Sequence, residues 1–166
     1  MNIRTILYLL LPFTSLAQDA TKHSLVGAWE IVQIEKELTN SVNSDPEPNL
    51  MLFTENHYSF VWSSDEDTMR RYKEPWVASD AEKMQRFDEI FVNTGSYKWE
   101  GEKLTVYPVV AKNPEFIGGY MIFKIEWDEH ELVLTPLDEY SVDGVQTPWV
   151  RVSSGLTHLT LNRLSK

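Results

Sequence analysis

Residues 119–137, GYMIFKIEWDEHELVLTPL, read as two strands joined by a tight turn. The strands cover Gly119–Asp128 and Glu131–Leu137, and the turn is Glu129-His130. Successive side chains of a strand point to opposite faces of a sheet. In the first strand the alternating set expected to face inward is Met121, Phe123, Ile125 and Trp127. The stretch therefore predicts an antiparallel hairpin with a largely aromatic inner face.

The same pattern recurs on both sides of this hairpin. The eight predicted strands are Leu25–Glu35, Leu50–Phe53, His57–Trp62, Ser96–Glu100, Lys103–Val109, Gly119–Asp128, Glu131–Leu137 and Val145–Ser153. Short turns at Thr54–Asn56 and Gly101-Glu102 join neighbouring strands. Two longer connections are expected to be loops, at Thr39–Asn49 and at Asn113–Gly119, the latter folding an aromatic side chain back toward the body.

One amphipathic helix is predicted over about residues 79–92. Ser79 is a suitable N-cap, and Glu82 three residues later completes a capping box. Apolar side chains recur every three or four residues, at Ala81, Met84, Phe87 and Phe91. Asn93-Thr94-Gly95 is expected to end the helix.

These elements predict an all-β fold. Many short strands without strand–helix alternation indicate a sandwich or a closed barrel. A barrel leaves no exposed sheet edges, and one of about eight strands can hold a single small ligand. We therefore expect an eight-stranded antiparallel barrel, with the inserted helix lying across one mouth or flank.

The first 17 residues, MNIRTILYLLLPFTSLA, are typical of a signal peptide. Arg4 gives a basic start, an apolar run follows, and Ser15-Leu16-Ala17 places small residues before the expected cleavage site. The alternative is a buried first strand or helix. The expected organisation is a signal peptide over 1–17, a flexible segment over 18–24, the barrel over 25–153 and a tail over 154–166, in a secreted or periplasmic protein.

Composition excludes several classes of function. With 25 acidic against 15 basic residues among 166, the net charge is −10, which argues against nucleic-acid binding. There is no cysteine, and the four histidines lack metal-ligand spacing. The acidic run Asp65–Asp67 is interpreted as a solvated loop in preference to a calcium site. No catalytic residue, metal or cofactor is assigned, and the oligomeric state is left open.

Two motifs at the ends of the predicted barrel resemble the lipocalin-like domain proteins of bacteria and fungi, which have calycin-type barrels. Gly27-Ala28-Trp29 is similar to the family's opening Gly-x-Trp, and Trp149-Val150-Arg151 to its closing Trp-x-Arg. The resemblance implies that Arg151 covers Trp29 and closes one end of the barrel. Other features in family order are Thr94–Tyr97, Asn113–Gly118 and Leu132–Pro136. Leu104–Tyr107 lacks the histidine that many relatives carry, so any chemistry done there is in doubt.

The predicted function is capture of a small hydrophobic or aromatic molecule inside the barrel. The expected ligand-contacting residues are Tyr58, Phe60, Trp62, Tyr97, Trp99, Tyr107, Phe123 and Trp127. Two alternatives stay open: a structural or envelope protein whose barrel is filled by its own side chains, and a cofactor-free isomerase or lyase acting on a lipid- or polyketide-like substrate. An open cavity would favour binding over the filled barrel.

Overall fold

The computed structural model describes residues 23–46, 48–63, 71–128 and 130–165. The predicted signal peptide and the acidic run Asp65–Asp67 lie outside these ranges. The strands are β1 Gly27–Lys36, β2 Ser41–Asn43, β3 Asn49–Phe53, β4 His57–Ser63, β5 Ile90–Glu100, β6 Lys103–Ala111, β7 Tyr120–Asp128, β8 Glu131–Tyr140 and β9 Thr157–Arg163. The helices are α1 Asp80–Glu89 and α2 Val150–Ser153, with single 3₁₀ turns η1 Glu37–Thr39 and η2 Pro114–Phe116.

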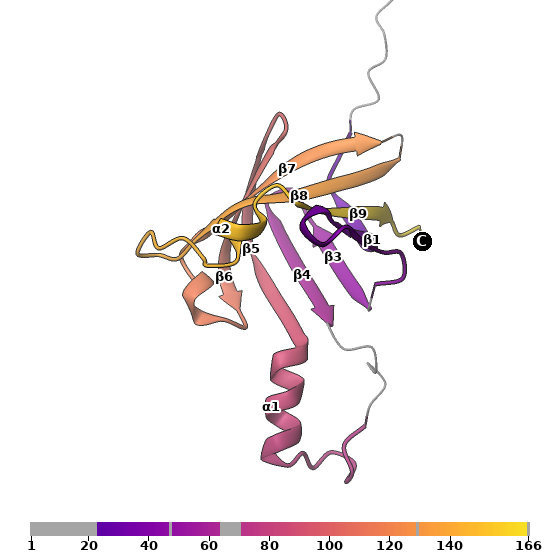
Figure 1. Ribbon diagram of the computed structural model, residues 1–166, viewed down its shortest axis with the longest axis vertical. Helices are drawn as coiled ribbons and strands as arrows, with labels where there is room; N and C mark the ends of the chain where they lie inside the picture. The colour runs from indigo at the N-terminus through magenta and orange to yellow at the C-terminus, as the bar shows by residue number, and fades with distance from the viewer. Residues whose placement is uncertain (1–22, 47, 64–70, 129, 166) are drawn as a thin grey trace, which may run out of the picture.

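The strands form one antiparallel sheet that closes on itself (Figure 1). From β3 to β9 each strand pairs with the next, and β1 pairs with both β3 and β9. Strand β2 adds a short pairing beside the last three residues of β1. The predicted eight-stranded antiparallel barrel is confirmed, with β1 and β3–β9 as its wall.

Alternation along the strands places the core inside the barrel, as predicted. On β7 the side chains of Phe123 and Ile125 are buried. Opposite Ile125, Leu134 of β8 is fully buried, and Leu161 of β9 is fully buried beside Leu132. The loop at 113–119 also behaves as expected, because Phe116 is buried at 5% exposure.

The prediction of a last strand over Val145–Ser153 is wrong. Pro148 has no N–H to donate, Trp149 adopts helical backbone angles, and α2 follows directly. The last strand is β9, inside the segment predicted to be a tail. Its buried residues Leu159 and Leu161 alternate with more exposed neighbours, which is the period of a strand with one buried face.

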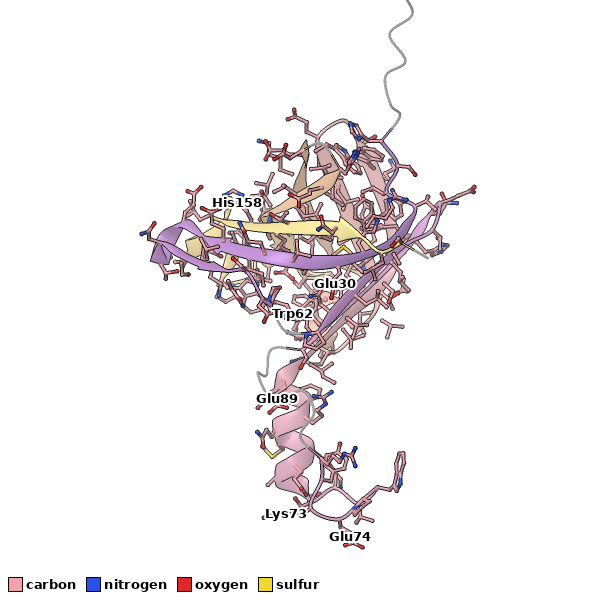
Figure 2. The ribbon with its side chains drawn as sticks, turned by 90° about the vertical axis from the view of Figure 1, so that its right-hand side faces the viewer. Glu30, Trp62, Lys73, Glu74, Glu89 and His158 are labelled. Atoms are coloured by element: carbon pink, nitrogen blue, oxygen red, sulfur yellow. The ribbon has the colours of Figure 1, made fainter. Side chains whose placement is uncertain are left out.

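Helix α1 begins as predicted but ends early and projects away from the barrel (Figure 1). The Ser79–Glu82 capping box is present. The helix ends at Glu89, because residues 90–93 pair with β4 as the start of β5. Because no loop separates α1 from β5, the helix continues outward instead of lying across a mouth or flank of the barrel. Figure 2 shows Glu89 near the barrel, and Lys73 and Glu74 at the far end of the helix.

The apolar stripe of α1 consequently has little to pack against. Met84 is 70% exposed and Phe87 57% exposed. Lys112, the residue after β6, holds the end of the helix. Its Nζ donates to the carbonyl oxygens of Phe87 at 3.0 Å and Asp88 at 3.5 Å. A cation at a helix C-terminus interacts favourably with the helix dipole. Among the described residues, no helix has the length and apolar character needed to cross a membrane.

One end of the barrel is closed by an indole and a guanidinium, and the arginine is Arg163 instead of Arg151. The Arg163 Cζ lies 4.5 Å from the centre of the Trp29 ring, and Nη1 donates to the Val26 carbonyl at 2.7 Å. Arg151 belongs to α2, before the chain enters β9. The predicted partner was wrong because the last strand was misplaced.

Gly27 is required by the same contact. A Cβ at this position would lie 2.9 Å from Arg163 Nη1, so the guanidinium would have to shift, and the φ of +153° is one that residues with a side chain rarely adopt. The Trp29 Nε1 donates to the Leu25 carbonyl at 2.7 Å, so the buried indole is also satisfied. The Gly-x-Trp spacing thus lets the guanidinium reach the ring.

We expect Arg163→Met to lower the free energy of unfolding by about 1–2 kcal/mol, because it removes a cation–π contact and hydrogen bonds to backbone carbonyls while keeping an apolar stem. Urea unfolding measures the change. Lys98→Met, which removes an exposed cation from β5, serves as the control and should shift stability by less than about 0.5 kcal/mol. Equal losses in the two variants would contradict the assigned closure.

Candidate functional site

The barrel contains an apolar cavity of about 270 Å³. Its walls come from strands on all sides, and they include Met51, Phe53, Leu104, Val106, Leu134 and Leu159. Lys36, at the opposite end of β1 from Trp29, is exposed and also borders the cavity. The cavity therefore lies toward the end opposite the Trp29–Arg163 closure.

Four of the eight predicted ligand-contacting residues line this cavity. They are Tyr58, Phe60 and Trp62 of β4 and Phe123 of β7. Alternation on β4 points these side chains inward, as the aromatic pattern predicts. Figure 2 shows Trp62 at the barrel end from which α1 projects.

The other four predicted residues lie elsewhere. Tyr97 packs edge-on against Phe53, at 5.3 Å between ring centres, and its hydroxyl donates to the Thr54 carbonyl at 2.7 Å. Trp99 and Trp127 gather at the closed end, where Trp127 lies 5.9 Å from Trp29 between ring centres. Tyr107 is 39% exposed and does not border the cavity.

Tyr107 lies on the face of β6 opposite the buried Leu104 and Val106, so its side chain points away from the cavity. For Trp99 and Trp127 the reason is their depth along the barrel axis. Inward-facing residues alternate along the whole length of a strand, but the cavity occupies only part of the barrel's length. Trp99 and Trp127 face inward near the closed end, where they fill space beside Trp29. Side-chain alternation predicts the face of a residue and not its depth along the barrel axis.

A small polar group is buried in the cavity wall. The hydroxyl of Tyr58 donates to Oδ1 of Asn93, and the Asn93 Nδ2 donates to the Met121 sulfur at 3.4 Å. Asn93 is only 1% exposed. Burial, with a smaller contribution from the charge of Glu139, raises the pKa of Tyr58 above its ordinary value, so this phenol stays protonated.

Glu139 is the polar group that sequence reasoning missed. Strict alternation from Leu132 and Leu134 would turn Asp138 inward. A bulge in the β7–β8 ladder shifts the register, so that Glu139 is paired with the inward-facing Met121. Glu139 is 2% exposed.

The Glu139 carboxyl is fixed on one oxygen only. Its Oε2 accepts from the Trp149 Nε1 at 2.7 Å and from the Thr147 hydroxyl at 3.2 Å. Its Oε1 is buried with no hydrogen-bond partner among the described residues. Burial raises the pKa of Glu139, although the two hydrogen bonds act in the opposite direction.

Glu139 borders a second hollow, of about 310 Å³, which we call the vestibule. The residues around the vestibule are Phe91, Lys112, Asn113, Phe116, Met121, Glu139 and Trp149. Phe91 and Met121 also border the apolar cavity. The two spaces are therefore neighbours that share part of a wall.

Comparison with known proteins gives no family assignment. No protein-family model and no curated protein matches the chain. A lipocalin-like protein from Bacteroides uniformis is 14% identical with a TM-score of 0.46, over 84% of this chain and 98% of that one. An uncharacterized protein from Bacteroides eggerthii is 10% identical with a TM-score of 0.46, over 85% of this chain and 100% of that one.

The raised pKa of Glu139 makes stability depend on pH with a defined sign. Between the ordinary and the raised pKa, the folded chain keeps the proton on Glu139, whereas the unfolded chain has already lost it. The free energy of unfolding therefore falls as pH rises from the ordinary glutamate pKa of 4.5 through the raised value. Glu139→Gln has no such proton, so we expect the stability of the original chain relative to this variant to decrease over that interval in denaturant titrations at several pH values.

Asp138→Asn is the matched control. A hydrogen bond from Gln146 lowers the pKa of Asp138, with smaller help from Tyr140 and its own neighbouring backbone. The stabilisation that this carboxylate provides is present above the ordinary pKa of 3.8 and is lost as pH falls through its lowered pKa. The original chain should therefore gain stability relative to Asp138→Asn as pH rises. This change has the opposite sign to the one expected for Glu139→Gln. The same sign for both variants would refute the assignment.

Proposed function

We propose that this chain is a binding protein that holds a small hydrophobic or aromatic molecule inside its barrel. The apolar cavity of about 270 Å³ is the observation that carries the proposal. Apolar cavities of roughly 150 Å³ bind benzene-sized molecules, and drug-sized ligands occupy pockets of roughly 300–1,000 Å³. The cavity suits a small ligand.

The cavity argues against the alternative of a barrel filled by its own side chains. Protein interiors are close-packed, and an apolar void of this size forfeits contacts that a larger side chain would make. Residues such as Val106 border the space without filling it. A ligand that occupies the cavity would restore those contacts.

The surface that the wall presents to the cavity is apolar. Tyr58 and Asn93 belong to the wall, but their polar groups bond to each other and to Met121. The Nε1 of Trp62 is buried and donates to no group among the described residues. The cavity itself therefore suits an apolar ligand body.

One observation bears on the alternative of a cofactor-free isomerase or lyase. General acid–base catalysis needs a carboxyl group facing the substrate, and Glu139 is a buried carboxyl. Glu139 borders the vestibule and not the apolar cavity. A ligand held in the apolar cavity alone therefore does not meet this carboxyl group.

Filling the cavity should abolish binding. We expect Val106→Phe to weaken binding of N-phenylnaphthylamine at least about tenfold, because the new ring occupies the space beside Leu104 and Met121. Fluorescence titration of the folded variant measures the affinity. Val109→Phe on the same strand is the matched control, since Val109 is 64% exposed and outside the cavity. Failure of the original chain to bind any apolar probe, or equal binding by both variants, would remove the proposal.

We also propose that the mature chain is exported, on the basis of residues 1–17. Expression of the full chain in a bacterial host, followed by mass spectrometry of the periplasmic and culture fractions, should give a mature protein that begins at Gln18. Ala17→Tyr should block processing, because signal peptidase reads small residues at this position. An unprocessed chain retained in the cytoplasm would contradict export. Native mass spectrometry of the same fractions tests for a captured ligand.

A further inference from the structure

The apolar cavity and the vestibule lie on the two sides of Met121. Met121 borders both spaces, and across the β7–β8 ladder its partner is Glu139. Methionine is unbranched and flexible, so this shared wall is one of the more adaptable parts of the barrel. An extended ligand can therefore occupy both spaces when the Met121 side chain changes rotamer.

Glu139 gives the vestibule a directed polar group. Trp149 and Thr147 hold one carboxyl oxygen and so fix the orientation of the side chain. The other oxygen has no hydrogen-bond partner within the described ranges, although only 2% of the residue is exposed. A buried polar atom without a hydrogen bond costs about 1–3 kcal/mol, so a ligand group that bonds to it gains affinity.

We propose that the two spaces form one site for an amphiphile, with an apolar chain in the cavity and a hydroxyl head group bound to Glu139. This inference rests on the proposed function and names the class of ligand. The tail meets a wall of aliphatic and aromatic side chains, and the head meets the single buried carboxyl of the described core. Medium-chain alcohols are the simplest members of the class.

Charges of both signs border the vestibule, from Lys112 and from Glu139 when it is ionised. A charged head group of either sign therefore meets one like charge as well as one opposite charge. A neutral head group avoids this repulsion. A hydroxyl both donates and accepts, so it can bond to Glu139 in either protonation state. Tyr58, the other titratable group near Glu139, stays protonated and adds no charge.

The test compares ligands that share a tail and differ in the head. Decanol, decyl methyl ether, decylamine and decanoic acid are titrated by calorimetry into the original chain at a pH above the raised pKa of Glu139, where its carboxylate can only accept hydrogen bonds. The ether keeps an oxygen acceptor but cannot donate, so we expect decanol to bind about tenfold tighter than the ether, the usual worth of one hydrogen bond to a charged or buried group. Decylamine and decanoic acid should bind more weakly than decanol.

Variants at Glu139 then locate the preference. Glu139→Leu should reduce the advantage of decanol over the ether to within about twofold, with ether binding retained. Glu139→Gln keeps an acceptor and a donor at the same place and should preserve most of the advantage. Asp138→Asn, which alters the adjacent carboxylate bonded to Gln146 and Tyr140, should leave it unchanged.

The outcomes separate this inference from the proposed function. If neither decanol nor the ether binds, both proposals fail. If both bind with equal affinity, the cavity holds ligands and the role of Glu139 is refuted. Tighter binding of decylamine or decanoic acid refutes the hydroxyl head group. Should Glu139→Leu not fold, the comparison of ligands on the original chain and on Glu139→Gln still decides the matter.

Discussion

The pairing of the first strand with the last is the constraint on which the rest of this structure depends. Strand β1 meets β3 through its first three residues and β9 along most of its length, which turns an open meander into a barrel. Closure buries Leu161 and Ile31, which are partners across the β1–β9 ladder, and pairs the first strand of the meander with the last. Closure also brings Arg163 of the last strand over Trp29 of the first strand.

Closure at one end explains why a cavity exists at the other. Near the Arg163 end the interior is filled by Trp29, Trp99 and Trp127. Toward Lys36 the inward side chains surround an apolar space without filling it. In this half of the barrel Tyr58 and Asn93 bond to each other. This asymmetry supports the proposed function, because a filled end can stabilise the fold while a hollow end is free to receive a ligand.

The bulge in the β7–β8 ladder brings a carboxyl group to the side of that space. It adds one residue to β8, so the residue facing Met121 is Glu139. A buried carboxyl is costly, and this one is partly compensated by Trp149 and Thr147, which come from the segment that crosses the barrel end before β9. Two irregular features of the fold, the bulge and the crossing segment, thus combine to build one directed group. Regular strands alone would have left the vestibule without it.

The amino-acid sequence by itself determined three hairpins with their turns, the capping box of α1 and the inward faces of β4 and β7. These depend on residues close in the chain and on a period of two or of three to four, so local pattern suffices. Only the tertiary structure decided that β9 closes the barrel, that Arg163 covers Trp29, that α1 projects outward, and that Phe123 borders the cavity while Trp127 does not. Those outcomes depend on register and on depth along the barrel axis. Pairing between distant strands sets both, and one bulge changes them, as it does at Glu139.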